Sequence, residues 1–164
     1  MVTVVTAHPR IDTAAYAKAK FVGKKTLHDP AREACVKLGF QTLYDIPQPY
    51  QMQVRAELIA SHLAALKKGI PKDAVLTFSV FEWLADWMRW TWNNTPSLAW
   101  DAVLKQTSDI AKHYDRIVHL ETGNLRAYDG YVWRDIPNAA QIDRLMRGLY
   151  IDLGVSKKVT FVKG

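Results

Sequence analysis

The alternation of apolar runs and amphipathic stretches divides the chain into short strands and longer helices. Four runs rich in β-branched and apolar residues are typical of strands that are buried on both faces. They cover residues 2–6, 74–79, 116–120 and 158–162. A shorter strand is expected around Lys25–His28. Because strands of this kind occur in parallel sheets covered by helices, the pattern favours an α/β fold.

The segments between these strands carry helical periodicity and recognisable helix ends. Asp12 or Thr13 can cap a helix that runs to Lys20, and Asp29-Pro30 can begin another that stops at Gly39. Further helices are expected at residues 51–68, 81–92, 97–114 and 138–153. The order of elements predicts a three-layer sandwich with a mainly parallel sheet of four or five strands. No boundary or repeat divides the chain, so residues 1–164 are expected to form one domain.

The expected helix at residues 81–92 is unusually rich in tryptophan. Trp83, Trp87 and Trp90 have helical spacing and therefore share a face. Core packing is the favoured interpretation of this face. Two functional alternatives are a stacking surface for nucleic-acid bases and a contact face for a second copy of the chain, which would make a homo-oligomer.

Charge and composition narrow the classes of partner. The net charge of +6 favours polyanionic ligands, namely a nucleotide or a nucleic acid. A single cysteine, Cys35, excludes an internal disulfide and a cysteine zinc cluster, and it suits the cytoplasm. The histidines show no metal-ligand spacing, and no segment reaches the roughly 18 apolar residues of a membrane helix. We therefore expect a cytoplasmic protein without a metal site or a membrane anchor.

The turn after the first strand lies where a phosphate-binding loop would lie. That loop has the pattern glycine, four residues, then Gly-Lys-Ser/Thr. Here Ala7 takes the place of the first glycine, and Asp12, Thr13 and Ala14 take the places of the Gly-Lys-Ser/Thr group. The strand-turn-helix context matches the pattern, whereas the residues needed for phosphate and magnesium do not.

The order of motifs along the whole chain resembles the P-loop kinase group that contains the ribosylnicotinamide kinase domain and related small AAA-type ATPases. The matching segments are Asp29-Pro30-Ala31-Arg32-Glu33, Gln51 or Gln53, Thr77-Phe78-Ser79-Val80 in place of Asp-Arg-Ser-Pro, Tyr114-Asp115-Arg116-Ile117-Val118, Asp129-Gly130 with Arg134, and Ile142-Asp143-Arg144-Leu145. The resemblance implies a P-loop kinase-like fold. It also implies that Asp29 and Arg32 take the substrate-side acid and base positions, and that Arg126 and Arg134 belong to a lid.

The departures from this group fall on the residues that carry phosphoryl transfer. The loop lysine and the magnesium-binding hydroxyl are absent, and Thr77-Phe78 replaces an acidic and basic pair. The sequence therefore predicts a degenerate P-loop kinase-like protein that has lost ordinary ATP-dependent phosphoryl transfer and serves in nucleotide binding, nucleic-acid binding or assembly. The departures argue against bound magnesium. The alternative is an enzyme with a rebuilt site for a phosphate-containing nucleoside or nucleotide.

The candidate site residues come from three segments that would meet at the carboxyl ends of the strands. The candidate acids and bases are His8, Asp12 and Asp29, and the candidate phosphate-binding residues are Arg10, Thr13, Arg32, Arg126 and Arg134. Asp12 and Asp29 have the alternative role of helix caps, and Arg134 that of a surface residue. A ligand is expected between the 7–13 turn, residues 29–32 and the lid.

Overall fold

The structure is a computed structural model that describes residues 1–8, 10–28, 35–41, 45–71, 73–91, 97–125 and 136–164. Four candidate site residues lie outside these ranges, namely Asp29, Arg32, Arg126 and Arg134. Their expected roles stay predictions. Cys35 is buried.

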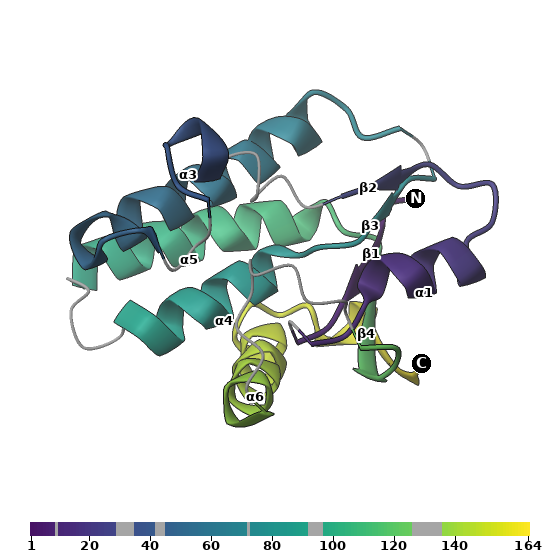
Figure 1. Cartoon of the computed structure of the whole chain (residues 1–164). Coiled ribbons are helices and arrows are strands. Elements are labelled where there is room, and N and C mark those ends of the chain that lie inside the picture. Colours follow the sequence, from purple (N-terminus) through teal and green to yellow (C-terminus); the bar gives the residue numbers. More distant parts are fainter. Residues whose placement is uncertain (9, 29–34, 42–44, 72, 92–96, 126–135) are drawn as a thin grey trace.

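Five parallel strands form one sheet, in the order β2-β3-β1-β4-β5 (Figure 1). The strands are β1 (Thr3–Thr6), β2 (Thr26–Leu27), β3 (Val75–Leu76), β4 (Arg116–Thr122) and β5 (Val159–Lys163). β1 lies at the centre between β3 and β4, and all four of its residues are buried. The parallel sheet expected from the sequence is therefore confirmed, and its first strand lies at the centre.

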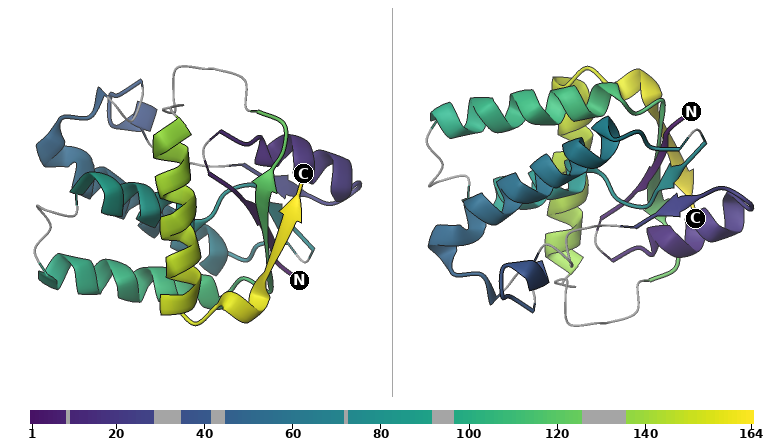
Figure 2. Two further views of the ribbon diagram at one scale, coloured as in Figure 1. Left: turned by 90° about the horizontal axis from the view of Figure 1, so that it is seen from below. Right: turned by 90° about the horizontal axis from the view of Figure 1, so that it is seen from above.

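Helices cover both faces of this sheet. They are α1 (Thr13–Lys20), α3 (Gln48–Lys67), α4 (Val80–Thr91), α5 (Ser97–Lys112) and α6 (Ile136–Asp152), followed by the short η3 (Ser156–Lys158). Figure 2 shows α1 on one face of the sheet and α4, α5 and α6 on the other. The three-layer α/β sandwich expected from the sequence is confirmed.

The alternation of side chains along β1 explains how one strand serves two apolar cores. Val4 packs in the large cluster formed with the helices α3 to α6, whereas Val5 packs in a smaller cluster that includes Ala17 of α1. Successive side chains of a strand point to opposite faces, so an uninterrupted apolar run is what this position requires.

Some element bounds differ from those expected. The strand predicted at residues 74–79 pairs only at Val75–Leu76, and α4 begins as early as Val80. α3 begins at Gln48 rather than Gln51, because Pro49 is accommodated in the first helical turn, where no backbone donor is needed. Among the described residues, none of the helices is long and apolar enough to cross a membrane.

The tryptophan face of α4 belongs to the core. Trp83 and Trp87 are buried, and the Trp87 ring stacks on Trp100 with centroids 5.3 Å apart. Core packing is confirmed for these two residues, and the alternatives of base stacking or a subunit contact are wrong for them, because their rings are covered by the chain itself. The side chain of Trp90 lies outside the described part of the structure.

Candidate functional site

A cleft lies at the carboxyl edge of the sheet, where β1 and β4 end beside α6. Its volume is about 340 Å³, and its polar lining is formed by His8, Arg10, Glu121, Asp143 and Arg144. Two of the sequence candidates, His8 and Arg10, lie in this lining. Parallel strands bring their carboxyl ends to one edge, which is where open α/β sheets bind ligands.

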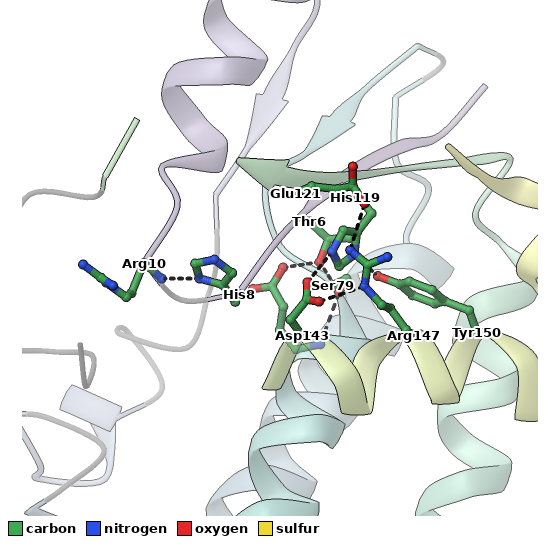
Figure 3. Close-up of polar contacts among 10 residues, drawn as sticks. Thr6, His8, Arg10, Ser79, His119, Glu121, Asp143, Arg147 and Tyr150 are labelled. Atoms are coloured by element: carbon green, nitrogen blue, oxygen red, sulfur yellow. Dashed lines mark hydrogen bonds and ion pairs between the residues drawn. The ribbon is translucent and has the colours of Figure 1, made fainter. Parts of the chain in front are cut away.

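His8 follows β1 directly and is half-buried at the cleft. Its Nδ1 accepts a hydrogen bond from the backbone N–H of Arg10 at 3.3 Å (Figure 3). Burial lowers the pKa of His8 below its ordinary value, although the negative charge of Asp143 opposes this shift and the positive charge of Arg10 adds to it. His8 is therefore neutral near pH 7, and with Nδ1 accepting, its proton lies on Nε2.

The backbone of the loop between β1 and α1 is hydrogen-bonded within the protein. Four consecutive N–H groups have protein acceptors: Arg10 to His8 Nδ1, Ile11 to the His8 carbonyl, Asp12 to the Asn124 carbonyl and Thr13 to the Ile11 carbonyl. The last three bonds measure 3.1, 2.8 and 3.1 Å. A phosphate-binding loop offers such groups to its ligand, and here they are engaged elsewhere.

Side chains of the same loop are also engaged. Asp12 caps α1 by accepting a hydrogen bond from the Ala15 N–H at 2.9 Å, and the Thr13 hydroxyl donates to the Thr77 carbonyl at 2.8 Å. Ala7 and Ile11 are buried in the apolar cluster between the sheet and α1. The loop is thus closed by packing, and the cap role that the sequence offered for Asp12 is present in the structure.

A chain of hydrogen bonds connects Asp143 to the core. Asp143 Oδ1 lies 2.7 Å from His119 Nε2, and His119 Nδ1 lies 2.8 Å from the Tyr150 hydroxyl (Figure 3). Burial alone would raise the pKa of Asp143, but hydrogen bonds from His119 and Arg147 outweigh it and lower the pKa to about 2. The ionised carboxylate can only accept, so His119 donates from Nε2.

Arg147 connects the two carboxylates of the cleft. Its Nε donates to Asp143 Oδ2 at 2.8 Å, and its terminal nitrogen donates to Glu121 Oε1 at 3.1 Å. The guanidinium also lies over the Phe161 ring, 4.4 Å from its centroid. This arrangement holds Asp143 and Glu121 in fixed positions and offsets part of their negative charge.

A second polar group lies where β1 and β3 end. The Thr6 hydroxyl donates to Glu82 Oε1, and Ser79 Oγ lies 2.8 Å from Thr6 Oγ1. Because the Thr6 proton is directed to Glu82, Ser79 is the donor to Thr6. Thr6 and Ser79 are drawn in the same close-up as His119 and Asp143 (Figure 3).

The sequence analysis did not select the residues of the Asp143 network as site residues. One usable signal was His119, a polar residue inside an otherwise apolar strand that is fully buried in the structure. Another was the Asp143-Arg144 pair in the closing helix.

Within the described ranges, no group of three or more His, Cys, Asp or Glu side chains is arranged to hold a metal ion.

The parallel sheet in the order β2-β3-β1-β4-β5, entered by a loop from the central strand into α1, defines a P-loop kinase-like fold. The chain is similar to the NadR protein solved in complex with NAD and AMP-PNP, with a TM-score of 0.70 and 12% sequence identity over 99% of this chain. A structure of NadR in complex with NR gives a TM-score of 0.64 and 10% identity over 98% of this chain.

These similarities establish the fold and not more. The chain spans 44% and 43% of the length of the two NadR chains. By sequence, the chain matches no protein family and no curated protein.

Proposed function

We propose that the chain binds a phosphate-containing ligand, a nucleotide in the first place, in the cleft beside His8, Arg10 and Arg144, and that it does not carry out ordinary ATP-dependent phosphoryl transfer. The main support for this proposal is that four loop N–H groups bond to acceptors within the protein, next to a cleft that Arg10 and Arg144 line. An assembly role is compatible with ligand binding of this kind.

The loss of phosphoryl transfer follows from what the loop lacks. A kinase loop holds phosphate by backbone N–H groups and a lysine. In this chain Thr13 stands at the lysine position, and its hydroxyl is bonded to the Thr77 carbonyl. Each charge-assisted hydrogen bond contributes about 1.5–3 kcal/mol, so the loss of several removes most of the affinity for ATP phosphates at this loop.

The cleft beside the loop offers charges that suit an anion. Arg10 and Arg144 line it, and Arg147 neutralises part of the charge of Asp143 and Glu121 from behind. Arginine guanidinium groups bind phosphate in a bidentate manner. The neutral His8 adds a hydrogen-bond donor through Nε2.

The class of ligand is supported by the structural neighbours. NadR was solved with NAD and AMP-PNP and with NR, and a shared fold makes a nucleotide the first class to test. A nucleic acid is less favoured, because the buried Trp83 and Trp87 remove the stacking surface that the sequence offered. The predicted roles of Asp29, Arg32, Arg126 and Arg134 would add ligand contacts from segments that remain outside the described residues.

Calorimetric titration with AMP, ADP, ATP and inorganic phosphate, with and without magnesium, tests the proposal. Replacement of Arg10 by alanine should weaken binding of the best ligand at least about tenfold, because one charge-assisted contact is lost. Arg116→Ala is the matched control, since this exposed arginine lies at the opposite, amino end of β4. Equal affinity of the parent, Arg10→Ala and Arg144→Ala proteins would place the ligand elsewhere. Magnesium-dependent ATP binding that a Thr13 substitution abolishes would restore the kinase interpretation.

A rebuilt enzyme is the second candidate, and His8 is the observation that favours it. Its neutral imidazole, with the proton on Nε2, can act as a hydrogen-bond donor that stabilises negative charge on an oxygen of the ligand. This candidate predicts turnover of the ligand found by calorimetry, with a rate that falls at least about a hundredfold in His8→Ala. Tight binding without any chemical change of the ligand would exclude it.

A further inference from the structure

The amino edge of the sheet lies opposite the cleft and gathers segments from four parts of the chain. Because all five strands are parallel, the residues that precede β2, β3, β4 and β5 meet at this edge. The strand register fixes their positions, since Thr3 pairs with both Val75 and Arg116, and Ile117 pairs with Val159. In the left view of Figure 2 the arrows of β4 and β5 point away from this edge. The amino edge comprises residues 21–25, 67–74, 112–116 and 152–158.

Basic side chains dominate the amino edge. A basic pair lies at the start of each strand from β2 to β5, namely Lys24 and Lys25, Lys67 and Lys68, Lys112 and Arg116, and Lys157 and Lys158. All but Lys158 are exposed. Among the described residues of this edge, these eight basic side chains stand against three acidic ones, Asp73, Asp115 and Asp152. The edge thus holds an excess of five positive charges, compared with six in the whole chain.

Three of the eight basic groups have partners inside the protein. Lys158 Nζ donates to two backbone carbonyl oxygens before β4, at 2.8 and 3.3 Å. Lys112 and Lys24 form salt bridges with aspartate side chains, at 2.7 and 3.6 Å. The remaining five form no salt bridge with any described residue: Lys25, Lys67, Lys68, Arg116 and Lys157. Their charges are therefore open to an external anion.

Helix ends explain only part of this charge. Lysines at the carboxyl end of a helix interact favourably with its dipole, and Lys67 of α3 and Lys112 of α5 are placed in this way. Lys25 and Arg116 lie outside helices and gain nothing from a dipole. Lys112 above all, and Lys67 more weakly, lower the pKa of Asp109, so the ends of α3 and α5 lie close together and add their charges to one surface.

The extent and the side chains of the amino edge favour a nucleic-acid duplex over a single strand. Neighbouring strands lie about 4.8 Å apart, so a row across five strands extends about 19 Å, more than the roughly 12 Å width of a major groove. Such a row can contact phosphates of both strands of a duplex. No Phe, Tyr or Trp among the described residues of this edge is exposed, so the edge offers no surface on which an unpaired base could stack.

We propose that the amino edge binds the phosphate backbone of a nucleic-acid duplex through its five unpaired basic side chains, without reading the base sequence. Phosphate contacts position a protein on a duplex but carry no sequence information. Backbone binding needs no stacking surface and is therefore compatible with the burial of Trp83 and Trp87. The surface lies at the opposite edge from the cleft, so this proposal stands independently of the proposed ligand site.

The salt dependence of DNA binding tests the proposal. Fluorescence anisotropy measures the affinity for a labelled duplex of about 20 base pairs between about 50 and about 200 mM salt. Five phosphate contacts predict a slope of about −4.5 for the logarithm of the association constant against the logarithm of the salt concentration. Lys25→Gln combined with Lys157→Gln removes two contacts, so the slope should fall to about −2.7 and the affinity at about 50 mM salt should fall at least about tenfold. Two duplexes of different sequence should bind equally well.

A charge-matched control is Lys37→Gln combined with Lys163→Gln. Both lysines are exposed and lie outside the amino edge, and Lys163 is at the carboxyl end of β5. The two double variants remove the same charge from the chain, so an effect of net charge alone would be equal in both. The control should keep the slope and the affinity of the parent. Urea denaturation of both double variants should match the parent, because all four side chains are exposed.

Several results would overturn the proposal. Equal losses in the two double variants would mean that net charge, rather than the amino edge, attracts the duplex. An absence of duplex binding at about 50 mM salt, or tighter binding of the single strand than of the duplex, would also contradict it. Vesicles that contain phosphatidylserine form a separate arm of the test. Binding to these vesicles and not to the duplex would identify the amino edge as a membrane-binding surface instead.

Discussion

Two neighbouring regions at the carboxyl edge of the sheet differ in whether their polar groups bond within the protein or line a cleft. The loop after β1 has the position of a phosphate-binding loop, yet its N–H groups bond to protein acceptors and Ile11 is buried beneath it. The end of β4 and the facing side of α6 instead present ionised side chains to a cleft. Position in a fold therefore does not determine where the ligand chemistry lies.

The loop after β1 and the network around Asp143 are also stabilised by different kinds of contact. The loop is held by a local helix cap, by apolar contacts with the sheet, and by bonds from Asp12 and Thr13 to the Asn124 and Thr77 carbonyls. The network of Asp143, His119, Tyr150 and Arg147 joins β4 to α6 by side-chain bonds between distant parts of the chain. Because His119 and Tyr150 are buried, disruption of this network should cost more stability than loss of the helix cap.

The largest effect is expected for His119→Ala. The substitution leaves a cavity in the core and removes the partners of the Tyr150 hydroxyl and of Asp143 Oδ1. A loss of about 3 kcal/mol in the free energy of unfolding follows from the cavity and the unpaired buried groups. Urea denaturation measures it, with the exposed His113→Ala as control. A loss no greater than that of the control would show that the network contributes little to stability.

A smaller effect is expected from Asp143→Asn, and it depends on pH. The pKa of Asp143 is lowered from 3.8 to about 2 in the folded state, so its stabilising contribution is complete above pH 3.8 and is lost as the pH falls through 2. Near pH 7 the variant should be less stable by roughly 2 kcal/mol, and this difference should vanish near pH 2.

His62 also makes stability depend on pH, and it does so equally in the parent and in the Asp143→Asn variant. Burial lowers the pKa of His62 from 6.5 to about 3, so the neutral form belongs to the folded state. Its contribution is present above pH 6.5 and is lost as the pH falls toward 3 in parent and variant alike. The difference between the two unfolding curves therefore isolates Asp143, and a difference that stays constant from pH 7 to pH 2 would contradict its assigned pKa.

The sequence predicted the loop region better than the network, for a physical reason. The cap by Asp12 and the buried β1 follow from local chemistry and from periodicity, both of which can be read from neighbouring residues. The His119–Asp143 bond joins residues 24 positions apart in different elements. Periodicity indicates that His119 is buried but not which side chain receives its proton. The partner becomes known only when α6 is placed against β4.

The helix cap should have the next smaller effect. Asp12→Ala removes the acceptor of the Ala15 N–H bond and should cost about 1 kcal/mol of unfolding free energy. Asp12→Asn preserves a capping oxygen and should restore most of that loss. Equal losses in the two variants would mean that the charge of Asp12, rather than the cap, is what the fold requires.

The smallest effect is expected from an attempt to restore the kinase pattern. The double variant Asp12→Gly with Thr13→Lys supplies the second glycine and the lysine, but it leaves the Arg10 and Ile11 N–H groups bonded to His8 and keeps Ile11 in the apolar cluster. A lysine side chain alone does not create the backbone cradle that holds the phosphates. We therefore expect the variant to show no gain in magnesium-dependent ATP binding over the parent when both are compared by calorimetry. Micromolar ATP affinity in the variant would mean that the loop opens readily. The parent would then fail to bind ATP because the glycine and lysine are missing, and not because the loop is packed.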